Sequence, residues 1–560
     1  MNSPLEKVFT LPELQGHIVH YLDRGSLVLC TRVSAQWHRL FNPHLWRKVL
    51  FRVPRDFSRQ GYLVQTLDLH MGDIPQDQRN HIRQHCSCLR TVHLHFQQLA
   101  PQGLKHLFDP IQHNGFVGEH IVELEIHVAE FSVIPLILPW LTHVRRKGYL
   151  VSLQRFMLGN GQLLGESQQI EVEDVLRFLQ VFPKTRMLSF GRIPIGESRQ
   201  ISAQEAEWEK WGWRENDEDV EQEDYADKEQ PDQRAQEQEQ EQTVESGSVE
   251  APLTSPLYDL DIYPRTISVL SRLLRRAPGL NRLCIRKAKD PQILSVIQES
   301  CPRLTNFRYV GNGRKDLIEF DWQTFLPHYP FTDALFFEDA LITDRTVHAI
   351  AESCFRTLQH LTLSYGTMVT TNSLIEILRS CTALEWLQCT TDSVSGDLFS
   401  HANSWTCCGS LRVLKLFGVQ LQGLEENEAF RVRIRQLPRL EMLSVKGSGF
   451  RIESLLNEED LSISPSSSFS PSNGSSGVSF EWSPSETTAV VFGARHCYRH
   501  LGVITMPKFE RGVITLPHLK ALLEAMPHVA YINFLDGYDE EAREWLRVHR
   551  PNLDMGVVVW

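Results

Sequence analysis

The sequence of 560 residues is poor in the features that mark secreted and membrane proteins. Residues 1–16 contain no basic leader followed by an apolar core, and the most apolar short stretch, 131–140, is interrupted by two prolines. Its 11 cysteines form no compact framework of pairs, which is typical of thiols in a reducing compartment. We therefore expect a cytoplasmic or nuclear protein that has no membrane partner.

The sequence also lacks the common signatures of catalysis. It has no G-x-x-x-x-G-K-[ST] phosphate-binding loop and no H-E-x-x-H helix, and the glycines of 159–165 miss the dinucleotide-binding spacing by one residue. The densest group of potential zinc ligands comprises His81, His85, Cys86, Cys88, His93 and His95. The positions of His93 and His95 fit a β-strand better than a zinc site, because these two residues flank Leu94 in alternation. We predict no enzymatic activity, no catalytic residue, no cofactor and no metal site.

The net charge of −12 is concentrated in one segment. Residues 205–245 hold 17 Asp and Glu against four Lys and Arg, so the remaining chain is nearly neutral. A Glu- and Gln-rich stretch cannot bury enough apolar area to form a core, and this predicts an acidic disordered insertion at 205–255. A Ser-, Pro- and Gly-rich stretch predicts a second, flexible insertion at 462–488. Because the body is neutral and the insertion acidic, we expect no nucleic-acid partner.

A pattern close to L-x-x-L-x-L recurs along the rest of the chain at intervals of roughly 27 residues. The copies begin at Val64, Leu89, Ile121, Leu153, Leu280, Leu304, Thr332, Leu358, Leu384, Leu411, Leu440, Leu501 and Val529. Each copy predicts a short strand with alternate residues buried, and the apolar spacing after it predicts a helix. The expected fold is therefore an α/β solenoid whose repeats occupy 60–200, 260–460 and 495–560.

The segment 342–363 shows the repeat most clearly. Residues 342–344 read Ile-Thr-Asp, and Val347 and Ile350 share one face of a helix that ends near Cys354. This order resembles the cysteine-containing leucine-rich repeats of F-box/LRR proteins. The positions after the strands lack the regular Asn or Cys found in many repeats, so we expect an irregular solenoid.

The N-terminal segment 9–51 predicts a small helical bundle. Pro12 opens a first helix, Ser26 is placed to cap a second helix, and Ser34 is placed to cap a third helix, which Asn42 and Pro43 should end. A bundle of about forty residues is too small to bury all of its apolar groups. Part of its surface should therefore bind a partner, although a helical cap that seals the first repeat is the alternative.

This segment closely resembles the F-box, which covers less than a tenth of the chain. The residues in F-box order and spacing are Leu11, Pro12, Leu14, Ile18, Leu22, Leu29, Cys30, Val33, Trp37, Leu45 and Trp46. The resemblance implies a substrate-recognition subunit of a Skp–cullin–F-box ubiquitin ligase. It implies that these residues bind a Skp-type adaptor, and through it a cullin, while the repeats hold a protein target.

Solenoids present an extended concave surface, so we expect the target on the concave face of the strands. Candidate target-binding residues are His93, His95, Arg308, Lys415 and Lys446. The alternative for these charges is an ordinary solvated surface. The alternative for the whole chain is a leucine-rich-repeat scaffold that binds partners without a cullin.

Overall fold

The computed structural model describes most of the predicted repeats. The described residues are 11–22, 24–51, 56–69, 76–96, 118, 120–128, 134–159, 169–197, 255–311, 320–329, 332–365, 367–400, 402–450, 503–506, 515–525, 529, 531–534 and 539–550. Residues 205–254 of the predicted acidic insertion and the whole predicted flexible insertion, 462–488, lie outside them.

Cα packing divides the chain into two units, Met1–Leu280 (unit 1) and Asn281–Trp560 (unit 2). Unit 1 has the strands β1 (Lys48–Phe51), β2 (Thr66–Leu69), β3 (Thr91–Phe96), β4 (Glu123–Val128), β5 (Arg155–Gly159), β6 (Ile170–Glu171), β7 (Met187–Gly196) and β8 (Asp259–Pro264). Its helices are α2 (Pro12–Tyr21), α3 (Arg24–Val33), α4 (Ala35–Arg47), α5 (Gln76–His85), α7 (Ile134–Arg146), α8 (Val172–Val181) and α10 (Ile267–Arg275), with a 3-10 turn η1 (Gly61–Leu63).

Unit 2 repeats the same plan with longer strands at its centre. Its strands are β9 (Arg282–Arg286), β10 (Asn306–Val310), β11 (Ala334–Glu338), β12 (Ile342–Thr343), β13 (His360–Ser364), β14 (Thr367–Met368), β15 (Trp386–Ser395), β16 (Val413–Gln420), β17 (Met442–Ser448), β18 (Val503–Met506) and β19 (Tyr531–Phe534). Its helices are α11 (Ile293–Ser300), α12 (Trp322–Phe325), α13 (Asp344–Ser353), α14 (Thr371–Ser380), α15 (Gly423–Arg435), α18 (Leu516–Ala525) and α19 (Glu540–His549), with the 3-10 turns η4 (Leu326–His328), η5 (Gly396–Phe399) and η6 (Thr406–Gly409).

All pairs of neighbouring strands are parallel, as expected when a helix returns the chain to the start of the next strand. Every predicted repeat has its strand, and equivalent apolar positions are in register, for example Leu361 with Leu387 and Leu387 with Leu414. These side chains are fully buried. Six of the described strands were not predicted, namely β1, β7, β8 and the two-residue strands β6, β12 and β14, although the repeat pattern is present at Leu257 before β8.

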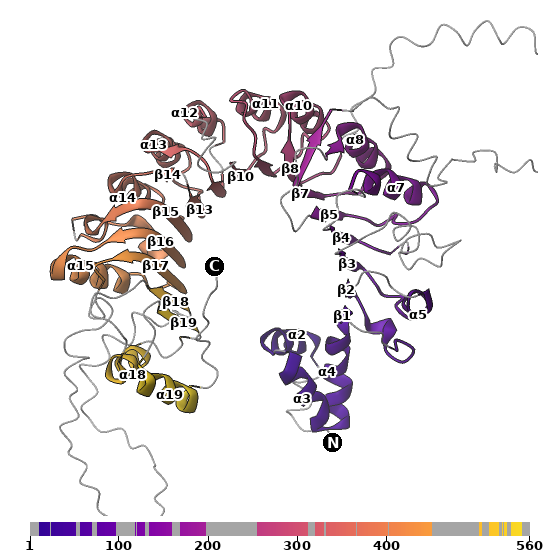
Figure 1. Cartoon of the computed structure of the whole chain (residues 1–560), viewed down its shortest axis with the longest axis horizontal. Helices are drawn as coiled ribbons and strands as arrows, with labels where there is room; N and C mark the ends of the chain where they lie inside the picture. Colours follow the sequence, from indigo (N-terminus) through magenta and orange to yellow (C-terminus); the bar gives the residue numbers. More distant parts are fainter. Residues whose placement is uncertain are drawn as a thin grey trace, which may run out of the picture. The chain divides into compact units, whose positions relative to one another are not determined.

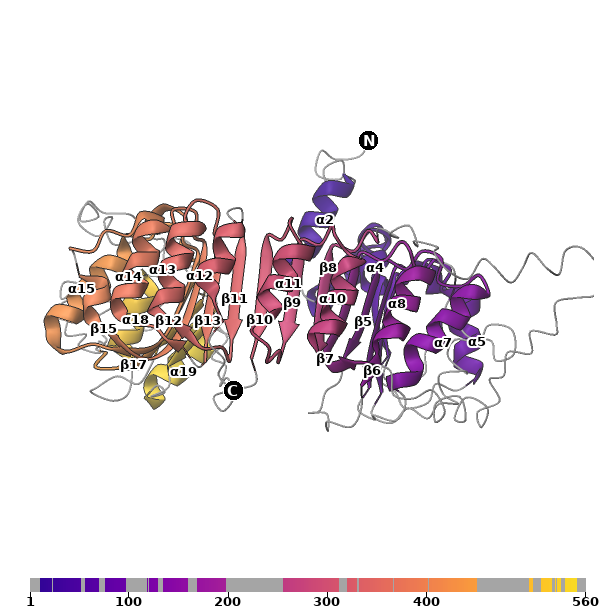
Figure 2. The ribbon, with the colours of Figure 1, turned by 90° about the horizontal axis from the view of Figure 1, so that it is seen from above.

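In each unit the helices lie along one side of the strands and leave the other strand face uncovered, which we call the open face (Figure 1). Figure 2 shows α11 to α15 stacked side by side in chain order across unit 2. The predicted helix of residues 342–354 is α13, where Val347 and Ile350 are buried as expected. No helix in the described part of the chain is long and apolar enough to span a membrane.

The turns after the strands explain how the repeats stack without a regular Asn or Cys. Lys287 and Asp339 each follow a strand, and both adopt a left-handed backbone, with φ of 53° and 50°. Their amides continue the ladder, because Lys287 donates to the carbonyl of Val310 at 2.6 Å and Asp339 to that of Ser364 at 2.9 Å. The strand pairing itself is irregular at three other places, because the register shifts within the β7–β8, β15–β16 and β16–β17 pairs.

Candidate adaptor-binding and target-binding surfaces

The first candidate surface is the three-helix segment at the start of unit 1. The helix α2 begins at Pro12, whose missing N–H costs nothing in a first turn. Ser34 caps α4 as predicted, since its hydroxyl accepts from the Trp37 amide at 3.1 Å. The prediction for Ser26 was wrong, because α3 already begins at Arg24 and Ser26 lies within the helix.

The predicted end of the third helix at Asn42 and Pro43 was also wrong. The helix α4 continues through Pro43 to Arg47 and leads directly into β1. It packs against β1 and the 3-10 turn η1, and this tertiary packing outweighs the one backbone hydrogen bond that a proline removes. The helical segment is therefore joined rigidly to the first strand of the repeats, where Val49 is buried in register with Leu67.

Four of the predicted adaptor-binding side chains are exposed although they are large and apolar. The exposed fractions are 49% for Leu11, 38% for Leu14, 63% for Leu29 and 64% for Val33. Leu29 and Val33 are four residues apart, so they occupy the same face of α3. Exposed apolar side chains paired on one helix face are typical of a surface that a partner covers.

The other predicted adaptor-binding residues are partly covered by the bundle itself. Half-buried side chains are those of Ile18, Leu22, Cys30, Trp37, Leu45 and Trp46. The Trp37 ring packs on Phe41, with 5.3 Å between ring centroids, and Phe41 is 1% exposed. These residues support the helices that display the exposed leucines and valine.

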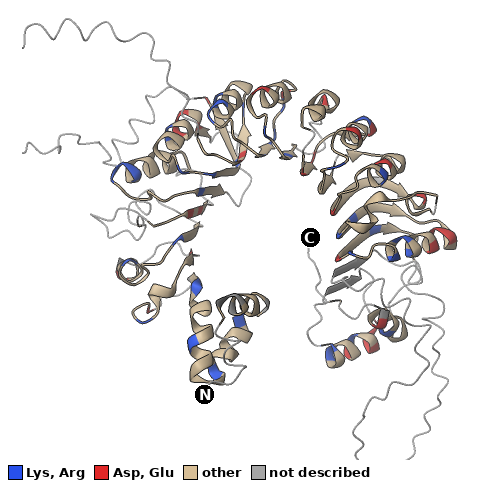
Figure 3. Cartoon of the chain, turned by 180° about the vertical axis from the view of Figure 1, so that it is seen from behind, with Lys and Arg blue, Asp and Glu red and all other residues tan. Residues whose placement is uncertain are grey.

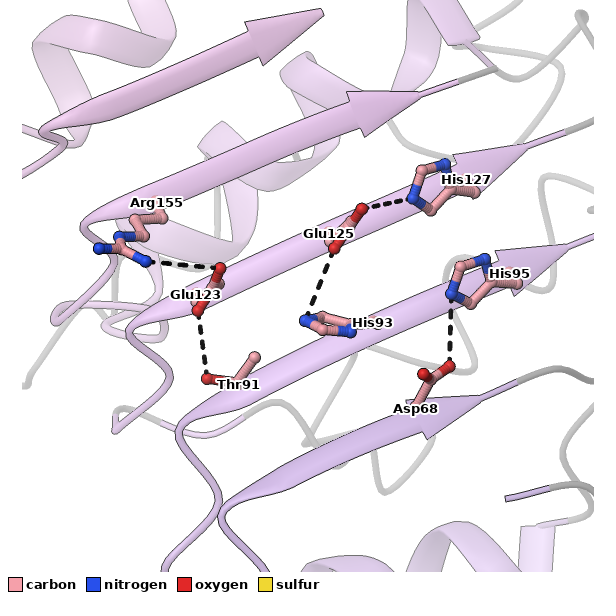
Figure 4. Close-up of polar contacts among 8 residues, drawn as sticks. All are labelled: Asp68, Thr91, His93, His95, Glu123, Glu125, His127 and Arg155. Carbon is pink, nitrogen blue, oxygen red and sulfur yellow. Dashed lines mark hydrogen bonds and ion pairs between the residues drawn. The ribbon is translucent and has the colours of Figure 1, made fainter. Parts of the chain in front are cut away.

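The second candidate surface is the open face of unit 1, where His93 and His95 project from β3 as predicted (Figure 4). His93 Nε2 lies 3.5 Å from a carboxylate oxygen of Glu125 on β4, and His95 Nε2 lies 3.3 Å from one of Asp68 on β2. Glu125 also contacts His127, and the His95 and His127 rings stack with centroids 4.6 Å apart.

At the start of the same strands, Glu123 makes a second set of polar contacts. It accepts a hydrogen bond of 3.4 Å from the Thr91 hydroxyl and lies 3.9 Å from the Arg155 guanidinium (Figure 4). The predicted histidines are therefore engaged by carboxylates of neighbouring strands. Sequence reasoning missed Asp68, Glu125 and His127, which share the alternation of His93 and could have been found from the aligned repeats.

The third candidate surface is the open face of unit 2, where the strands carry basic residues (Figure 3). Arg308 on β10 is held by Glu338 of β11 at 2.7 Å. Lys415 on β16 lies over the Trp386 ring, with 4.7 Å from its nitrogen to the centroid, and Lys446 on β17 lies 5.2 Å from the Phe417 centroid. The structure brings the two lysines onto adjacent strands and leaves Arg308 four strands away.

No three His, Cys, Asp or Glu side chains among the described residues are placed to hold a metal ion. The cysteines that precede strands β10, β13 and β15 are buried, and burial raises the pKa of Cys301 and Cys381 to about 12, so both are protonated thiols. The thiol of Cys354 donates a hydrogen bond between repeats, since its sulfur lies 3.8 Å from the Tyr329 carbonyl oxygen of the preceding repeat.

Comparisons with known proteins give a family match for the short helical segment. No curated protein matches the chain. Solved structures that match include a chain of the yeast Rad7 and Elc1 complex, with 11% identity over 86% of this chain and 91% of that one and a TM-score of 0.40. Another is a leucine-rich-repeat protein of Leptospira interrogans, with 10% identity over 91% of this chain and 100% of that one and a TM-score of 0.33. Residues 12–52 match the family described as F-box-like, so the chain carries an F-box-like domain followed by a parallel-stranded repeat.

Proposed function

We propose that this protein is the substrate-recognition subunit of an SCF-type ubiquitin ligase and acts in the cytoplasm or the nucleus. The F-box-like domain binds a Skp-type adaptor, which connects the chain to a cullin. The open strand faces of the repeats bind the target protein. The chain itself performs no chemistry, because ubiquitin transfer belongs to its partners.

The observation that carries this proposal is the exposure of Leu14, Leu29 and Val33 within the F-box-like match at 12–52, and of Leu11 directly before it. Burying a Leu or Val side chain fully is worth roughly 1.5–3 kcal/mol, and an isolated domain leaves that free energy unused here. An adaptor that covers these side chains gains it on binding.

The connection between the two parts supports the same function. Helix α4 runs into β1 without a linker, and β1 pairs with β2 of the first repeat. The adaptor-binding domain is therefore joined to the first repeats of unit 1 without a flexible linker. Such positioning raises the effective concentration of target lysines beside a charged ubiquitin carrier.

The test replaces Leu29 and Val33 together by alanine and measures capture of a co-expressed Skp-type adaptor and cullin. Because both side chains are exposed, the variant should fold normally yet lose adaptor affinity by about tenfold to a hundredfold. The matched control is Met368→Ala with Leu424→Ala in unit 2, whose side chains are equally exposed at 65% and 64%.

Capture of adaptor and cullin by the control, but not by the Leu29 and Val33 variant, supports the proposal. Equal capture by both variants would overturn the adaptor assignment. Capture of the adaptor without any cullin would instead favour the scaffold that acts outside a ligase.

A further inference from the structure

The loops that lead into the strands of unit 1 carry an excess of positive charge. We call them the strand-start rim, which comprises residues 47–48, 61–66, 85–91, 120–123, 145–155, 182–187, 255–259 and 275–280. The rim contains eleven Lys and Arg but only two Asp and Glu. The equivalent described loops of unit 2 are 281–282, 300–306, 332–334, 354–360, 380–386, 407–413 and 435–442. They contain six Lys and Arg against three Asp and Glu, so the excess is a property of unit 1.

Backbone hydrogen bonds align the rim from one repeat to the next. The Arg90 amide donates to the Gln65 carbonyl at 2.9 Å. In the same way, the Arg186 amide donates to the Gln154 carbonyl at 2.7 Å. These bonds extend the strand pairing by one residue, so positions 47, 65, 90, 122, 154, 186 and 258 form one row. Parallel strands are spaced by roughly 4.8 Å, which makes the row roughly 30 Å long.

The cations of the rim are accessible to a ligand. Arg90 and Arg186 are exposed, and neither side chain forms an ion pair with a described residue. The same holds for Lys184, which precedes Arg186 by two residues. One of the two acids, Glu123, is already engaged by Arg155 at 3.9 Å (Figure 4). The strand-start rim therefore presents positive charge along most of its length.

Two exposed tyrosines belong to the same rim. Tyr258 follows Arg186 in the row, since its amide donates to the Arg186 carbonyl at 2.8 Å, and it is 43% exposed. Tyr62 lies in η1 near the other end of the rim and is 58% exposed. An exposed aromatic ring beside a row of cations is the combination with which proteins bind single-stranded nucleic acids, because bases stack on the rings while cations contact phosphates.

We propose that the strand-start rim of unit 1 binds single-stranded nucleic acid. Arg90, Lys184 and Arg186 contact the phosphates, and Tyr62 and Tyr258 stack on bases. Arginine supplies eight of the eleven cations, and its planar guanidinium matches phosphate with two parallel hydrogen bonds. This activity goes beyond the recognition of a protein target, because it uses the edge of the repeats rather than their open face.

A single strand fits these features better than other polyanions. The bases of a duplex are stacked on each other and cannot reach the tyrosines, and an acidic peptide would leave both rings unused. The expectation of no nucleic-acid partner came from the average charge of the chain. Salt screens charges over about 8–10 Å at physiological ionic strength, so the charge of the rim itself decides what binds there.

The test measures fluorescence anisotropy of labelled oligouridylate and oligothymidylate, each of about twelve nucleotides, with the full chain. The two probes compare RNA with DNA, and contacts to phosphates and base faces should allow both to bind. A DNA duplex of the same length and a polyglutamate peptide serve as competitors and should compete poorly. The affinity for single strands should fall as salt is added.

Two variants separate the phosphate contacts from the stacking. Arg90→Gln with Arg186→Gln should reduce the affinity about tenfold or more, and it should lower the slope of log affinity against log salt by roughly 1.4, because each phosphate contact contributes roughly 0.7. Tyr62→Leu should reduce the affinity about fivefold or more without changing that slope. All three side chains are exposed, so both variants should keep the thermal midpoint of the wild type.

The matched control is Arg303→Gln with Arg439→Gln. These exposed arginines occupy the loops before β10 and β17 in unit 2, where they directly precede Leu304 and Leu440. Their loss should change the affinity by less than about twofold, because they lie outside the strand-start rim.

Three results would overturn the proposal: no binding of either single strand at low salt, tighter binding of the duplex or of polyglutamate, or equal losses in the unit 1 and unit 2 arginine variants. Adaptor capture is measured on the same variants. The substitutions at 62, 90 and 186 retain every residue of the F-box-like match, so capture should be unchanged while nucleic-acid binding is lost. Failure of one function is thereby distinguished from failure of the other.

Discussion

The two units place charge differently on the same kind of strand face. In unit 1, the histidines of β3 face carboxylates on β2 and β4, and Glu123 faces Arg155. In unit 2, Lys415 and Lys446 face aromatic rings. The first arrangement pairs charges of opposite sign between neighbouring strands, as Arg308 and Glu338 also do in unit 2, whereas the second sets ammonium groups over aromatic rings. A shared repeat therefore does not imply a shared binding property.

The two units also differ in how a buried charged side chain is hydrogen-bonded. In unit 2, Arg433 of α15 is 5% exposed but donates to Gln436 at 2.9 Å and to the Ser400 carbonyl at 2.8 Å, with a further bond to the Asn403 carbonyl. In unit 1, Asp174 of α8 is 7% exposed, and one of its oxygens has no partner among the described residues. The buried guanidinium of Arg433 is therefore held by several hydrogen bonds, which we call the supported charge. The carboxyl group of Asp174 is less well satisfied, and we call it the unsupported charge.

The largest effect should come from removing the supported charge. Arg433→Met keeps most of the side-chain volume but deletes three hydrogen bonds and leaves the Asn403 carbonyl without its side-chain donor. We expect the free energy of unfolding to fall by about 3 kcal/mol, measured by urea denaturation. Arg412→Met, which removes an arginine with a half-exposed side chain from Glu385 and Glu441, should lower the free energy of unfolding much less. Equal losses would show that burial is not what makes Arg433 matter.

Removing the unsupported charge should have a smaller effect of opposite sign. Burial, followed by the charge of Glu171, raises the pKa of Asp174 from 3.8 to about 6, despite Arg177 at 3.9 Å. Between these two pH values the unfolded chain has lost a proton that the folded chain keeps, so stability falls as pH rises through the window. Asp174→Asn should therefore match the wild type at pH 3 and exceed it by roughly 2–3 kcal/mol at pH 7.

The control for this pH dependence is Asp77→Asn, which changes an exposed acid in the first turn of α5. Because this side chain is exposed, we expect only a small stability difference from the wild type at pH 7. A difference for Asp174→Asn that is already present at pH 3 would mean that the ionised carboxylate is not the source of the instability.

Much of the fold could be predicted from sequence, because strand geometry dictates that buried residues alternate and helix geometry dictates the spacing of apolar residues on one face. Leu361, Leu387 and Leu414 were placed correctly for that reason. The missed strands have local causes. Strand β1 follows a proline-containing helix without a turn signal, and β7 begins after Thr185, a polar residue in the first apolar position of the repeat.

The candidate site could be predicted only in part. The resemblance to the F-box identified Leu29 and Val33, and their exposure follows from a helix face that the small bundle cannot cover. Partners across strands were not predictable from one repeat at a time. Glu338 beside Arg308 and Trp386 beneath Lys415 each come from a neighbouring repeat, and the strand register decides which residues meet.

The smallest expected change in stability concerns the open face of unit 1, where histidines are paired with carboxylates. Glu125→Gln removes the charge that His93 and His127 share, but these side chains are partly exposed, at 19% for Glu125 and 36% for His127. Exposed ion pairs contribute little, so the free energy of unfolding should fall by less than about 1 kcal/mol. A loss larger than about 1 kcal/mol would mean that these ion pairs stabilise the sheet more than their exposure allows.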